Sequence, residues 1–402
     1  MINLYSQRGK RMKKSVFFVL AMASLISMSC TTTNSASNAA DTASEGLVIA
    51  PDSTNVKILG RTFTKNNTLF LAQSASAIEF EVEAKSLTVN LTGDTTARPY
   101  RGTAIPSNLA RLTIYVNGEL KETVTMDAQK KSVTIFNEKK VQKASVRIAK
   151  ITESAQSYAG IKELVLDKNG KINPAPAKDL KIEFIGDSIT CGYGVEADGA
   201  NNSFTTQTEN AEKAYAYLTA KALNADYSLV SYSGYGIYSG YTGDGNRNTL
   251  SLVPPVYPKV CFNYSDGSKN NLEWDFGNFK PQLVVINLGT NDDSYCKDQA
   301  KKQLYVDSYV EFLKDVRSKN PDAYIVCSLG IMGDNLYPSV EKAVETYSAQ
   351  TGDKRIEAFH FVPHTAADGY GADWHPSAKT QANRAEVLTA HLKTLLDNGT
   401  IK

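Results

Sequence analysis

The sequence predicts two successive domains, an N-terminal antiparallel β-sandwich of jelly-roll type and a C-terminal α/β domain whose parallel sheet is covered by helices. The length of 402 residues exceeds one ordinary domain, which makes two the natural expectation. Residues up to about 170 alternate apolar and polar side chains in short runs, whereas later residues alternate apolar runs with helical periods. A composition of 42% hydrophobic and 21% charged residues is that of a chain that buries a core.

The first segment is predicted to be an export signal. Residues 8–14 are rich in Lys and Arg, and residues 16–28 are apolar or small, a stretch too short to remain as a membrane-spanning helix. We therefore expect a signal peptide over residues 1–29 and a flexible tether over the polar residues 30–53. Cys30 resembles the lipidated cysteine of a bacterial lipoprotein, and ordinary export with an incidental cysteine is the alternative. The protein is expected in the bacterial cell envelope, with a lipid anchor at Cys30 as its contact with the membrane.

Charge and cysteine content argue against two classes of function. The formal net charge of +2 includes five basic and no acidic residues within the signal peptide, so the exported chain carries about −3. A mildly acidic chain without a basic run is a poor candidate for nucleic-acid binding. The five cysteines form no CxxC pair and no Cys/His spacing suited to zinc, so we expect no metal site.

Short strands with alternating side chains define the first domain, which we place at residues 54–170. Turn residues such as Asn117-Gly118 and Gly93-Asp94 separate them, at a spacing typical of an antiparallel sandwich. The predicted strands are residues 78–84, 86–93, 111–118, 132–137, 143–153 and 161–167. Residues 169–179 contain two prolines without periodicity and are expected to be a linker.

Apolar strands alternate with amphipathic helices over residues 178–402, which are expected to form the second domain. Continuous apolar runs indicate strands buried on both faces, as in a parallel sheet between two helix layers. The predicted strands are residues 181–186, 227–233, 281–289 and 323–330, and the predicted helices are residues 210–224, 303–320 and 377–397. Because ligands bind at the carboxyl ends of such strands, residues at those ends are the candidates for function.

Three candidate residues follow the first three strands of this sheet. Ser188 comes directly after the first strand, where its hydroxyl either projects above the sheet edge or caps a helix. Gly234 follows the second strand, where a backbone N–H without a neighbouring Cβ is able to approach a ligand; a plain glycine-rich loop is the alternative. Asn291, in the motif LGTND after the third strand, presents its amide either to a developing oxyanion or to its own backbone.

A fourth candidate is His375, in the motif DWHPS immediately before the last predicted helix. Pro376 restricts the backbone at His375 and Ser377 is able to cap the helix, so the ring is expected at a defined turn. Taken alone, a surface histidine without a role is the alternative.

Together the four motifs resemble those of the SGNH hydrolase superfamily, both in their order and in their strand-end positions. The segments GDSITCGYG, WDFGNFKPQLVVINLGTND and DWHPS are more particular. They are similar to segments of the family-two carbohydrate esterases, which carry a β-sandwich ahead of an SGNH domain and remove acetyl groups from plant polysaccharides. The similarity runs from about residue 54 to the C-terminus.

The resemblance implies a role for each candidate. Ser188 is the implied nucleophile and His375 the implied general base, which takes the serine proton and returns it to the leaving sugar hydroxyl. The backbone N–H groups of Ser188 and Gly234, with the side-chain amide of Asn291, are the implied oxyanion hole. This mechanism needs no cofactor and no metal.

The orienting acid is the point at which the sequence departs from the commoner superfamily pattern. Many members carry an aspartate three residues before the histidine, a position that is Ala372 here, whereas Asp373 lies two residues before it. Some family-two esterases resemble Ser-His dyads, in which a backbone carbonyl orients the imidazole. Asp373 is therefore a candidate orienting acid, with such a carbonyl as the alternative.

Aromatic and sulfur-containing side chains near these motifs complete the candidate set. Trp374 and Tyr235 are candidates for stacking on sugar rings or for walling an acetyl pocket, with structural packing as an equal alternative. Cys191 is expected to be a small buried hydrophobe. Whether Cys261 and Cys296 form a disulfide cannot be deduced from the sequence.

The expected function is that of a serine esterase that removes O-acetyl groups from xylan, mannan or related oligosaccharides, which are its expected partners. Two alternatives remain. One is an esterase, lipase or thioesterase with the same catalytic residues and another acyl substrate. The other is a noncatalytic glycan-binding lipoprotein, against which the presence of Ser188, Asn291 and His375 together argues.

Overall fold

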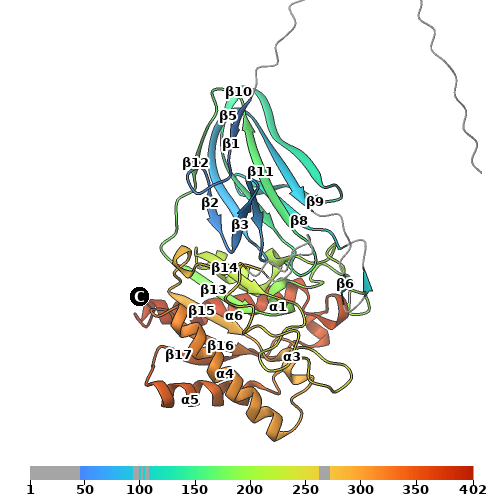
Figure 1. Cartoon of the computed structure of the whole chain (residues 1–402), viewed down its shortest axis with the longest axis vertical. Coiled ribbons are helices and arrows are strands. Elements are labelled where there is room, and N and C mark those ends of the chain that lie inside the picture. The colour runs from blue at the N-terminus through green and yellow to red at the C-terminus, as the bar shows by residue number, and fades with distance from the viewer. Residues whose placement is uncertain (1–45, 94–98, 101–102, 105–107, 262–271, 402) are drawn as a thin grey trace, which may run out of the picture. The chain divides into compact units, whose positions relative to one another are not determined.

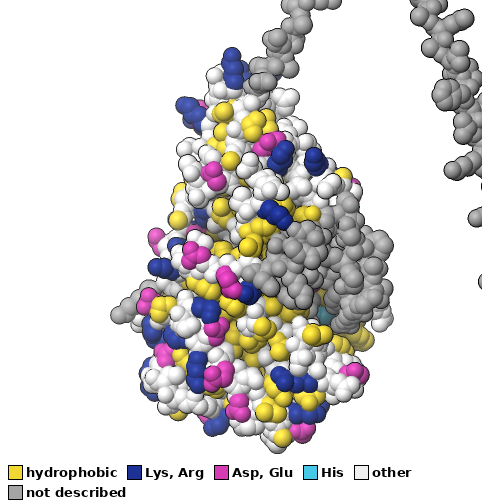
Figure 2. All heavy atoms as spheres, viewed as in Figure 1, with side chains coloured by type: hydrophobic (Ala, Val, Ile, Leu, Met, Phe, Trp, Pro, Cys, Tyr) yellow, Lys and Arg dark blue, Asp and Glu magenta, His cyan; other side chains and the backbone are white. Residues whose placement is uncertain are grey.

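Figure 1 shows the computed structural model of the chain, in which residues 46–93, 99–100, 103–104, 108–261 and 272–401 are described. The predicted signal peptide, Cys30 and the tether as far as residue 45 lie outside these ranges. Within them, no helix is both long enough and apolar enough to cross a membrane. Figure 2 shows that positively and negatively charged side chains are intermixed over one face of the molecule.

The N-terminal domain is one antiparallel sheet of ten strands, which confirms the predicted antiparallel β domain (Figure 1). The strand order is β3-β4-β11-β5-β10-β8-β9, with β1 paired to β11 and with β2 and β12 paired to β5. The strands are β1 (Leu47–Ile49), β2 (Lys57–Leu59), β3 (Thr62–Lys65), β4 (Thr68–Leu71), β5 (Ala77–Gly93), β8 (Arg111–Val116), β9 (Glu119–Thr125), β10 (Lys130–Lys150), β11 (Ala159–Leu166) and β12 (Lys171–Pro174). β6 (Pro99–Tyr100) and β7 (Thr103–Ala104) form a separate two-stranded pair.

Two strands are longer than the sequence predicts. β5 unites the predicted strands 78–84 and 86–93, and β10 unites 132–137 with most of 143–153. The ladder between β5 and β10 contains two register shifts. Between Thr134 and Phe136 one extra residue of β10 forms a β-bulge, and between Asn137 and Gln142 the pairing is more irregular. Because bulges bend a strand and increase its twist, the ten strands form one curled sheet rather than two separate ones.

The bend in β5 is visible in the side-chain pattern. From Ile78 to Ala84 the buried side chains are even-numbered, whereas from Leu87 to Gly93 they are odd-numbered. The phase of the alternation therefore changes near Lys85, which is why the sequence predicts two strands there. The buried side chains form one core, which includes Ile78, Phe80, Leu87, Val89, Leu112, Ile114, Ile148, Ile161 and Leu164.

Six strands of this sheet are not among the predicted ones: β1, β2, β3, β4, β9 and β12. Two of them lie in segments that are predicted to be a tether and a linker. Leu47–Ile49, inside the predicted tether, forms β1 and pairs with β11. Lys171–Pro174, inside the predicted linker, forms β12 and pairs with β5. Neither segment has a regularly buried face, because most residues of β1 and of β12 are exposed. Backbone pairing rather than apolar alternation places them in the sheet.

The C-terminal domain is built on a parallel sheet of five strands in the order β14-β13-β15-β16-β17, which confirms the predicted α/β fold. The strands are β13 (Lys181–Gly186), β14 (Asp226–Ser231), β15 (Leu283–Asn287), β16 (Tyr324–Leu329) and β17 (Ile356–His360). The helices are α1 (Ser188–Cys191), α2 (Tyr215–Ala222), α3 (Thr290–Asp293), α4 (Gln299–Lys319), α5 (Tyr337–Thr351) and α6 (Ala378–Asp397). Strand β17 and helix α5 are not among the predicted elements. The predicted helix 210–224 is shorter, because a 3₁₀ turn at Ala211–Lys213 precedes α2.

Helices cover both faces of the parallel sheet. Val284 and Ile286 of β15 belong to the apolar cluster that contains side chains of α4 and α5. Leu283 and Val285 of the same strand belong to the cluster that contains side chains of α2 and α6. Consecutive residues of β15 therefore point into opposite cores, which explains the continuous apolar run in the sequence.

Buried ion pairs and apolar contacts join the β domain to the α/β domain. Arg61, between β2 and β3, pairs at 3.2 Å with Glu183 of β13, and both side chains are fully or almost fully buried. Lys57 of β2 pairs at 2.6 Å with Asp226 of β14. Because removal of one partner would leave a buried charge uncompensated, these pairs favour one defined arrangement of the two domains.

Candidate active site

The central strands of the parallel sheet end in register, because the last residue of β13 pairs with the last residues of both β14 and β15. The segments that follow these strands start at the same edge of the sheet. They carry the predicted site residues Ser188, Gly234 and Asn291. This edge is where open parallel sheets bind ligands.

Ser188 is the first residue of the short helix α1 and is 5% exposed. The N-cap of α1 is the preceding Asp187, whose carboxylate accepts a hydrogen bond of 3.0 Å from the backbone N–H of Ile189. The alternative in which Ser188 caps the helix therefore does not apply. Its hydroxyl is engaged with another side chain.

The partner of that hydroxyl is His375. The distance between Ser188 Oγ and His375 Nε2 is 2.8 Å, although the two residues are 187 positions apart. The segment that carries the ring is held at its far end, because the Ser377 hydroxyl caps α6 by accepting a hydrogen bond of 3.2 Å from the N–H of Thr380. The predicted serine and histidine are thus brought into hydrogen-bond distance.

Backbone carbonyls face the other nitrogen of the ring. His375 Nδ1 lies 3.2 Å from the carbonyl oxygen of Ala372 and 3.2 Å from that of Asp373. Asp373 and Trp374 both adopt positive φ, 48° and 65°, so the chain folds back on itself immediately before the histidine. This turn aims the two carbonyls at the imidazole.

The carboxylate of Asp373 is engaged elsewhere. It accepts hydrogen bonds of 2.7 Å from the hydroxyl of Tyr193 and 3.1 Å from the backbone N–H of Phe204. An orienting acid would have to contact the imidazole. The structure does not bring the Asp373 carboxylate to the His375 ring, so it does not show the contact that this prediction requires. The arrangement matches the alternative, in which a backbone carbonyl lies against Nδ1.

Tyr193 is a site residue that the sequence analysis does not single out. Its ring stacks on the His375 imidazole with centroids 4.0 Å apart and on Phe204 with centroids 3.9 Å apart. The segment GDSITCGYG already indicates this contact. Its last glycine, Gly194, lies against the His375 turn, and a Cβ there would come within 2.4 Å of Ala372. Close approach of these two backbones lets the aromatic ring cover the imidazole.

The amide of Asn291 joins the segments that follow the three strands. Its Nδ2 donates hydrogen bonds of 2.8 Å to the carbonyl oxygen of Tyr235 and 3.3 Å to the carboxylate of Asp187. Gly234 has a φ of +82°, a conformation that favours glycine, and a Cβ at this position would meet no atom of the described residues within 4 Å. The space in front of Gly234 is therefore open, as an approach route to its backbone requires.

Two buried carboxyl groups support this arrangement. Asp292 accepts hydrogen bonds of 2.7–3.1 Å from the backbone N–H groups of Ile237, Tyr238 and Ser239, in the loop that follows Gly234. Burial raises the pKa of Asp292 to about 6. Burial, and to a lesser degree the Asp292 charge, raises the pKa of Asp187 to about 7.

The predicted aromatic candidates have different environments. Trp374 is 59% exposed next to His375, with its ring edge packed on Tyr370 at a centroid distance of 5.2 Å. Tyr235 is 7% exposed, and its ring packs on Tyr232 at 5.2 Å. Trp374 thus presents a free aromatic surface, whereas Tyr235 contributes its backbone carbonyl to Asn291.

The cysteines of the described ranges are all buried and form no disulfide with one another: Cys191, Cys261, Cys296 and Cys327. The predicted burial of Cys191 is confirmed. Cys261 and Cys296 do not form a disulfide with each other. Side-chain atoms of Glu153, Cys191 and Glu209 lie within 4.8 Å of one another, a cluster that Cys/His spacing in the sequence does not reveal.

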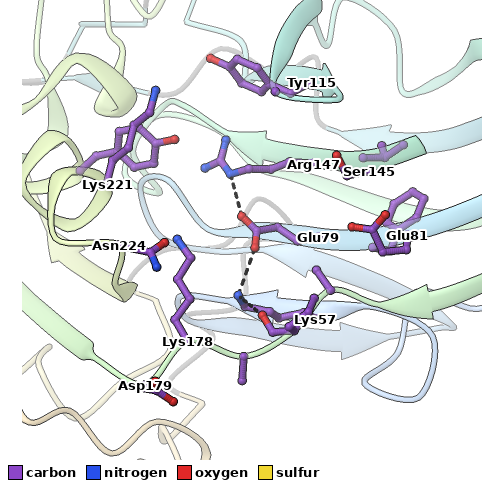
Figure 3. A pocket seen from close by; sticks show the side chains of 17 residues that line it. Lys57, Glu79, Glu81, Tyr115, Ser145, Arg147, Lys178, Asp179, Lys221 and Asn224 are labelled. Carbon is purple, nitrogen blue, oxygen red and sulfur yellow. Dashed lines mark hydrogen bonds and ion pairs between the residues drawn. The ribbon is translucent and has the colours of Figure 1, made fainter. Parts of the chain in front are cut away.

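A separate cavity of about 570 Å³ lies at the opposite edge of the parallel sheet (Figure 3). It is lined by Asp179 and Asn224, which precede β13 and β14, whereas Ser188 follows β13. In Figure 3 the Glu79 carboxylate lies between Arg147 and Lys57 and pairs with them at 3.3 Å and 3.2 Å. These three charged side chains all belong to the β domain and neutralise one another. The cavity is distinct from the Ser188 site because it lies at the other edge of the parallel sheet.

A buried serine hydroxyl bonded to an imidazole, at the carboxyl edge of a parallel sheet between helices, is the arrangement of a serine hydrolase. Residues 182–388 match the family described as GDSL-like Lipase/Acylhydrolase, about half of the chain, and the protein belongs to this family. Residues 58–176 match the domain described as Carbohydrate esterase 2 N-terminal.

Known proteins similar to the chain agree with this assignment. It is 38% identical over 233 residues to the cellulase/esterase CelE of Acetivibrio thermocellus, a match that covers 57% of this chain and 27% of that protein. It is 31% identical over 262 residues to an acetylxylan esterase / glucomannan deacetylase of Cellvibrio japonicus, covering 62% and 69%. The chain thus spans about a quarter of the first relative and about two thirds of the second.

A solved structure supports the fold over both domains. A family two carbohydrate esterase from Clostridium thermocellum in complex with cellohexaose has a TM-score of 0.73 and 30% sequence identity to this chain. The similarity covers 85% of this chain and 99% of that one. The combination of a β domain with an SGNH-type α/β domain is therefore shared.

Proposed function

We propose that the protein is a serine esterase that removes O-acetyl groups from acetylated xylan, mannan or related oligosaccharides. The observation that carries the proposal is the 2.8 Å contact between Ser188 Oγ and His375 Nε2 at the carboxyl edge of the sheet. The substrate class is supported by the acetylxylan esterase / glucomannan deacetylase and the cellohexaose-bound esterase to which the chain is similar.

In the acylation step, Ser188 Oγ attacks the acetyl carbonyl carbon while His375 Nε2 takes the hydroxyl proton. The ring then carries a positive charge, and its Nδ1–H donates to the carbonyl oxygens of Ala372 and Asp373 at 3.2 Å. The imidazolium is stabilised by these carbonyl dipoles, and no buried carboxylate has to be desolvated beside the ring.

The negative charge that develops on the acetyl oxygen needs hydrogen-bond donors fixed in advance. The backbone N–H groups of Ser188 and Gly234 and the Nδ2 of Asn291 are the proposed donors, and Nδ2 would exchange its longer bond of 3.3 Å to Asp187 for the oxyanion. Collapse of the tetrahedral intermediate breaks the bond to the sugar oxygen, which receives the proton from His375. Water then attacks the acetyl-serine by the same route and releases acetate.

The test is acetate release from acetylated xylan, acetylated glucomannan and acetylated cello-oligosaccharides, with Ser188→Ala as the blank. We expect release from at least one of these glycans and none from the variant. Hydrolysis of long-chain nitrophenyl esters in preference to the acetyl ester would support another acyl substrate instead. Glycan binding without acetate release by the wild-type protein would contradict the esterase proposal.

We propose further that the esterase acts in the cell envelope and is anchored by lipidation of Cys30. The order of a basic segment, an apolar segment and a cysteine supports this proposal. Fractionation of bacterial cells that express the full chain tests it: the wild type should sediment with membranes and Cys30→Ser should not. Equal distribution of the two proteins would contradict the anchor.

A further inference from the structure

A carboxyl group of the β domain lies directly beneath the loops of the candidate active site. Glu153 follows the end of β10 by three residues and is fully buried. Its Oε2 accepts a hydrogen bond of 2.9 Å from the backbone N–H of Ser233. Ser233 immediately precedes Gly234, so this bond fixes the peptide next to the one that carries the Gly234 N–H.

The same oxygen faces the helix that begins with Ser188. Cys191, at the end of that helix, has its Sγ 3.8 Å from Glu153 Oε2 and 3.2 Å from the hydroxyl of Ser231. One carboxylate oxygen is therefore in contact with the segment after β13 and with the segment after β14. These segments carry two of the three proposed oxyanion donors.

Glu153 is itself held by its surroundings. Its Oε1 accepts a hydrogen bond of 3.3 Å from Gln156, and Gln156 accepts one of 3.0 Å from Asn108. Its backbone N–H donates to the carboxylate of Glu209 at 3.1 Å. Each of these side chains is almost completely excluded from solvent, so Glu153 has little freedom to move.

Glu209 is a second carboxyl group within this cluster. It is fully buried, and its Oε1 has no hydrogen-bond partner among the described residues. Burial raises the pKa of Glu153 and, together with the Glu153 charge, raises the pKa of Glu209 well above its ordinary value. Two buried carboxyl groups this close do not both ionise readily, so the charge of one favours the protonated form of the other.

A metal ion is the competing occupant of the same cluster, because atoms of Glu153, Cys191 and Glu209 lie within 4.8 Å of one another. The surroundings favour a proton. The charges of Lys150 and Arg111 lower the pKa of Glu209, so a positive field is already present at the carboxyl pair. Burial raises the pKa of the Cys191 thiol well above its usual range, which disfavours the thiolate that a metal requires.

We infer that Glu153 is a positioning residue of the esterase, supplied by the β domain, which fixes the Ser233 peptide and so the direction of the Gly234 N–H. This inference rests on the proposed function, since it assigns Gly234 to the oxyanion hole. It makes the β domain a structural part of the catalytic site. Glu209 holds Glu153 by accepting its backbone N–H.

Two substitutions and one control test this inference. Glu153→Ala removes the acceptor for Ser233, whereas Glu153→Gln keeps an oxygen acceptor of the same reach. Glu212→Gln is the matched control, because Glu212 is also buried at the domain boundary but bonds Thr113 and Tyr115, away from the Ser188 loops. The readouts are kcat and KM for p-nitrophenyl acetate, the rate at which a fluorophosphonate labels Ser188, and the melting temperature.

We expect Glu153→Ala to lower kcat and the labelling rate together by about tenfold or more, with KM within about twofold, because an oxyanion donor acts mainly in the transition state. Glu153→Gln should stay within about threefold of the wild type, and Glu212→Gln should lose stability without a comparable loss of kcat. Wild-type kcat in a folded Glu153→Ala variant would overturn the inference. The inference would also be overturned if Glu212→Gln lowered kcat as much as Glu153→Ala does, at an equal fall in melting temperature.

The remaining outcomes are also decisive. If Glu153→Ala does not fold, Glu153→Gln decides alone, and a loss of more than about tenfold in its kcat overturns the inference. Loss of wild-type activity on dialysis against a chelator, with recovery on addition of Zn²⁺, would show that the carboxyl cluster holds a metal ion instead and would overturn the inference. Because fluorophosphonate labelling needs no acetylated substrate, it still tests Glu153 if acetate release fails and the proposed function is rejected.

Discussion

The hydroxyl of Tyr193 donates a hydrogen bond of 2.7 Å to the carboxylate of Asp373, and this bond joins the segment of the nucleophile to the turn before the histidine. Tyr193 lies five residues after Ser188, and its ring covers one face of the His375 imidazole. The Asp373 carboxylate is therefore linked to the histidine through the Tyr193 ring and through the backbone turn that precedes His375.

Substitution of Asp373 should reduce activity moderately. Asp373→Asn keeps an oxygen that accepts from the Tyr193 hydroxyl, so we expect kcat to fall by about tenfold or less. Asp373→Ala and Tyr193→Phe each remove one partner of the Tyr193–Asp373 hydrogen bond, so each should lower kcat more than Asp373→Asn does. Because the two act through the same bond, the double variant should be less impaired than the product of the single effects. Activity of Asp373→Asn as low as that of Ser188→Ala would instead make Asp373 the orienting acid.

Removal of the nucleophile or the base should abolish turnover without unfolding the protein. Ser188→Ala is expected to lower kcat for acetyl esters by at least about a thousandfold, and His375→Ala by a similar factor, since an unassisted serine hydroxyl is a weak nucleophile at neutral pH. Steady-state kinetics with circular dichroism as the folding control checks this expectation. Near-normal turnover in either variant would contradict the serine mechanism.

Much of the fold follows from periodicity, and the exceptions have physical causes. β15 was predictable because its residues are buried on both faces, which leaves a continuous apolar run. The edge strand β17 was missed because only one of its five residues is buried. β5 was predicted as two strands because its buried side chains change phase at the bend near Lys85.

The candidate site was predictable only where a short motif defines it. Ser188, Asn291 and His375 each lie in a motif of five or fewer residues, so local sequence was sufficient to propose them. The contact of Tyr193 with Asp373 joins residues 180 positions apart, and the contact of Glu153 with Ser233 joins residues 80 apart. The first contact depends on how distant segments of one domain pack and the second on how the two domains pack, and no local sequence pattern reports either.

Substitution of Asn291 should separate transition-state stabilisation from substrate binding. Asn291→Ala is expected to lower kcat by roughly 100-fold with little change in KM, because the bond to the oxyanion strengthens mainly in the transition state. Asn291→Asp is a useful second variant, since it keeps the size of the side chain but loses its donor. If either variant changed KM alone, Asn291 would bind the substrate rather than the oxyanion.

The stability of the protein should fall as the pH rises from the pKa of Asp187 in the unfolded chain to its pKa in the folded protein. Burial raises the pKa of Asp187 to about 7, whereas an unfolded aspartate titrates near 4. Below about pH 4 both states are protonated, and between the two values only the folded state keeps the proton. The free energy of unfolding should therefore decrease by up to about 1.4 kcal/mol per pH unit for this proton, between about pH 4 and pH 7.

Urea unfolding at a series of pH values, for the wild type and Asp187→Asn, measures this dependence. The amide remains a good N-cap for α1 but does not titrate, so the slope between pH 4 and pH 7 should be smaller in the variant. Asp298→Asn is the matched control, because Asp298 also caps a helix but is exposed, and its backbone bond to Lys301 lowers its pKa. The ionised Asp298 carboxylate stabilises the folded protein above the pKa of an unfolded aspartate, and this stabilisation is lost as the pH falls. Asp298→Asn should therefore change the pH dependence of the free energy of unfolding in the direction opposite to Asp187→Asn. Equal slopes for the wild type and Asp187→Asn would show that Asp187 is ionised in the folded protein at the same pH as in the unfolded chain.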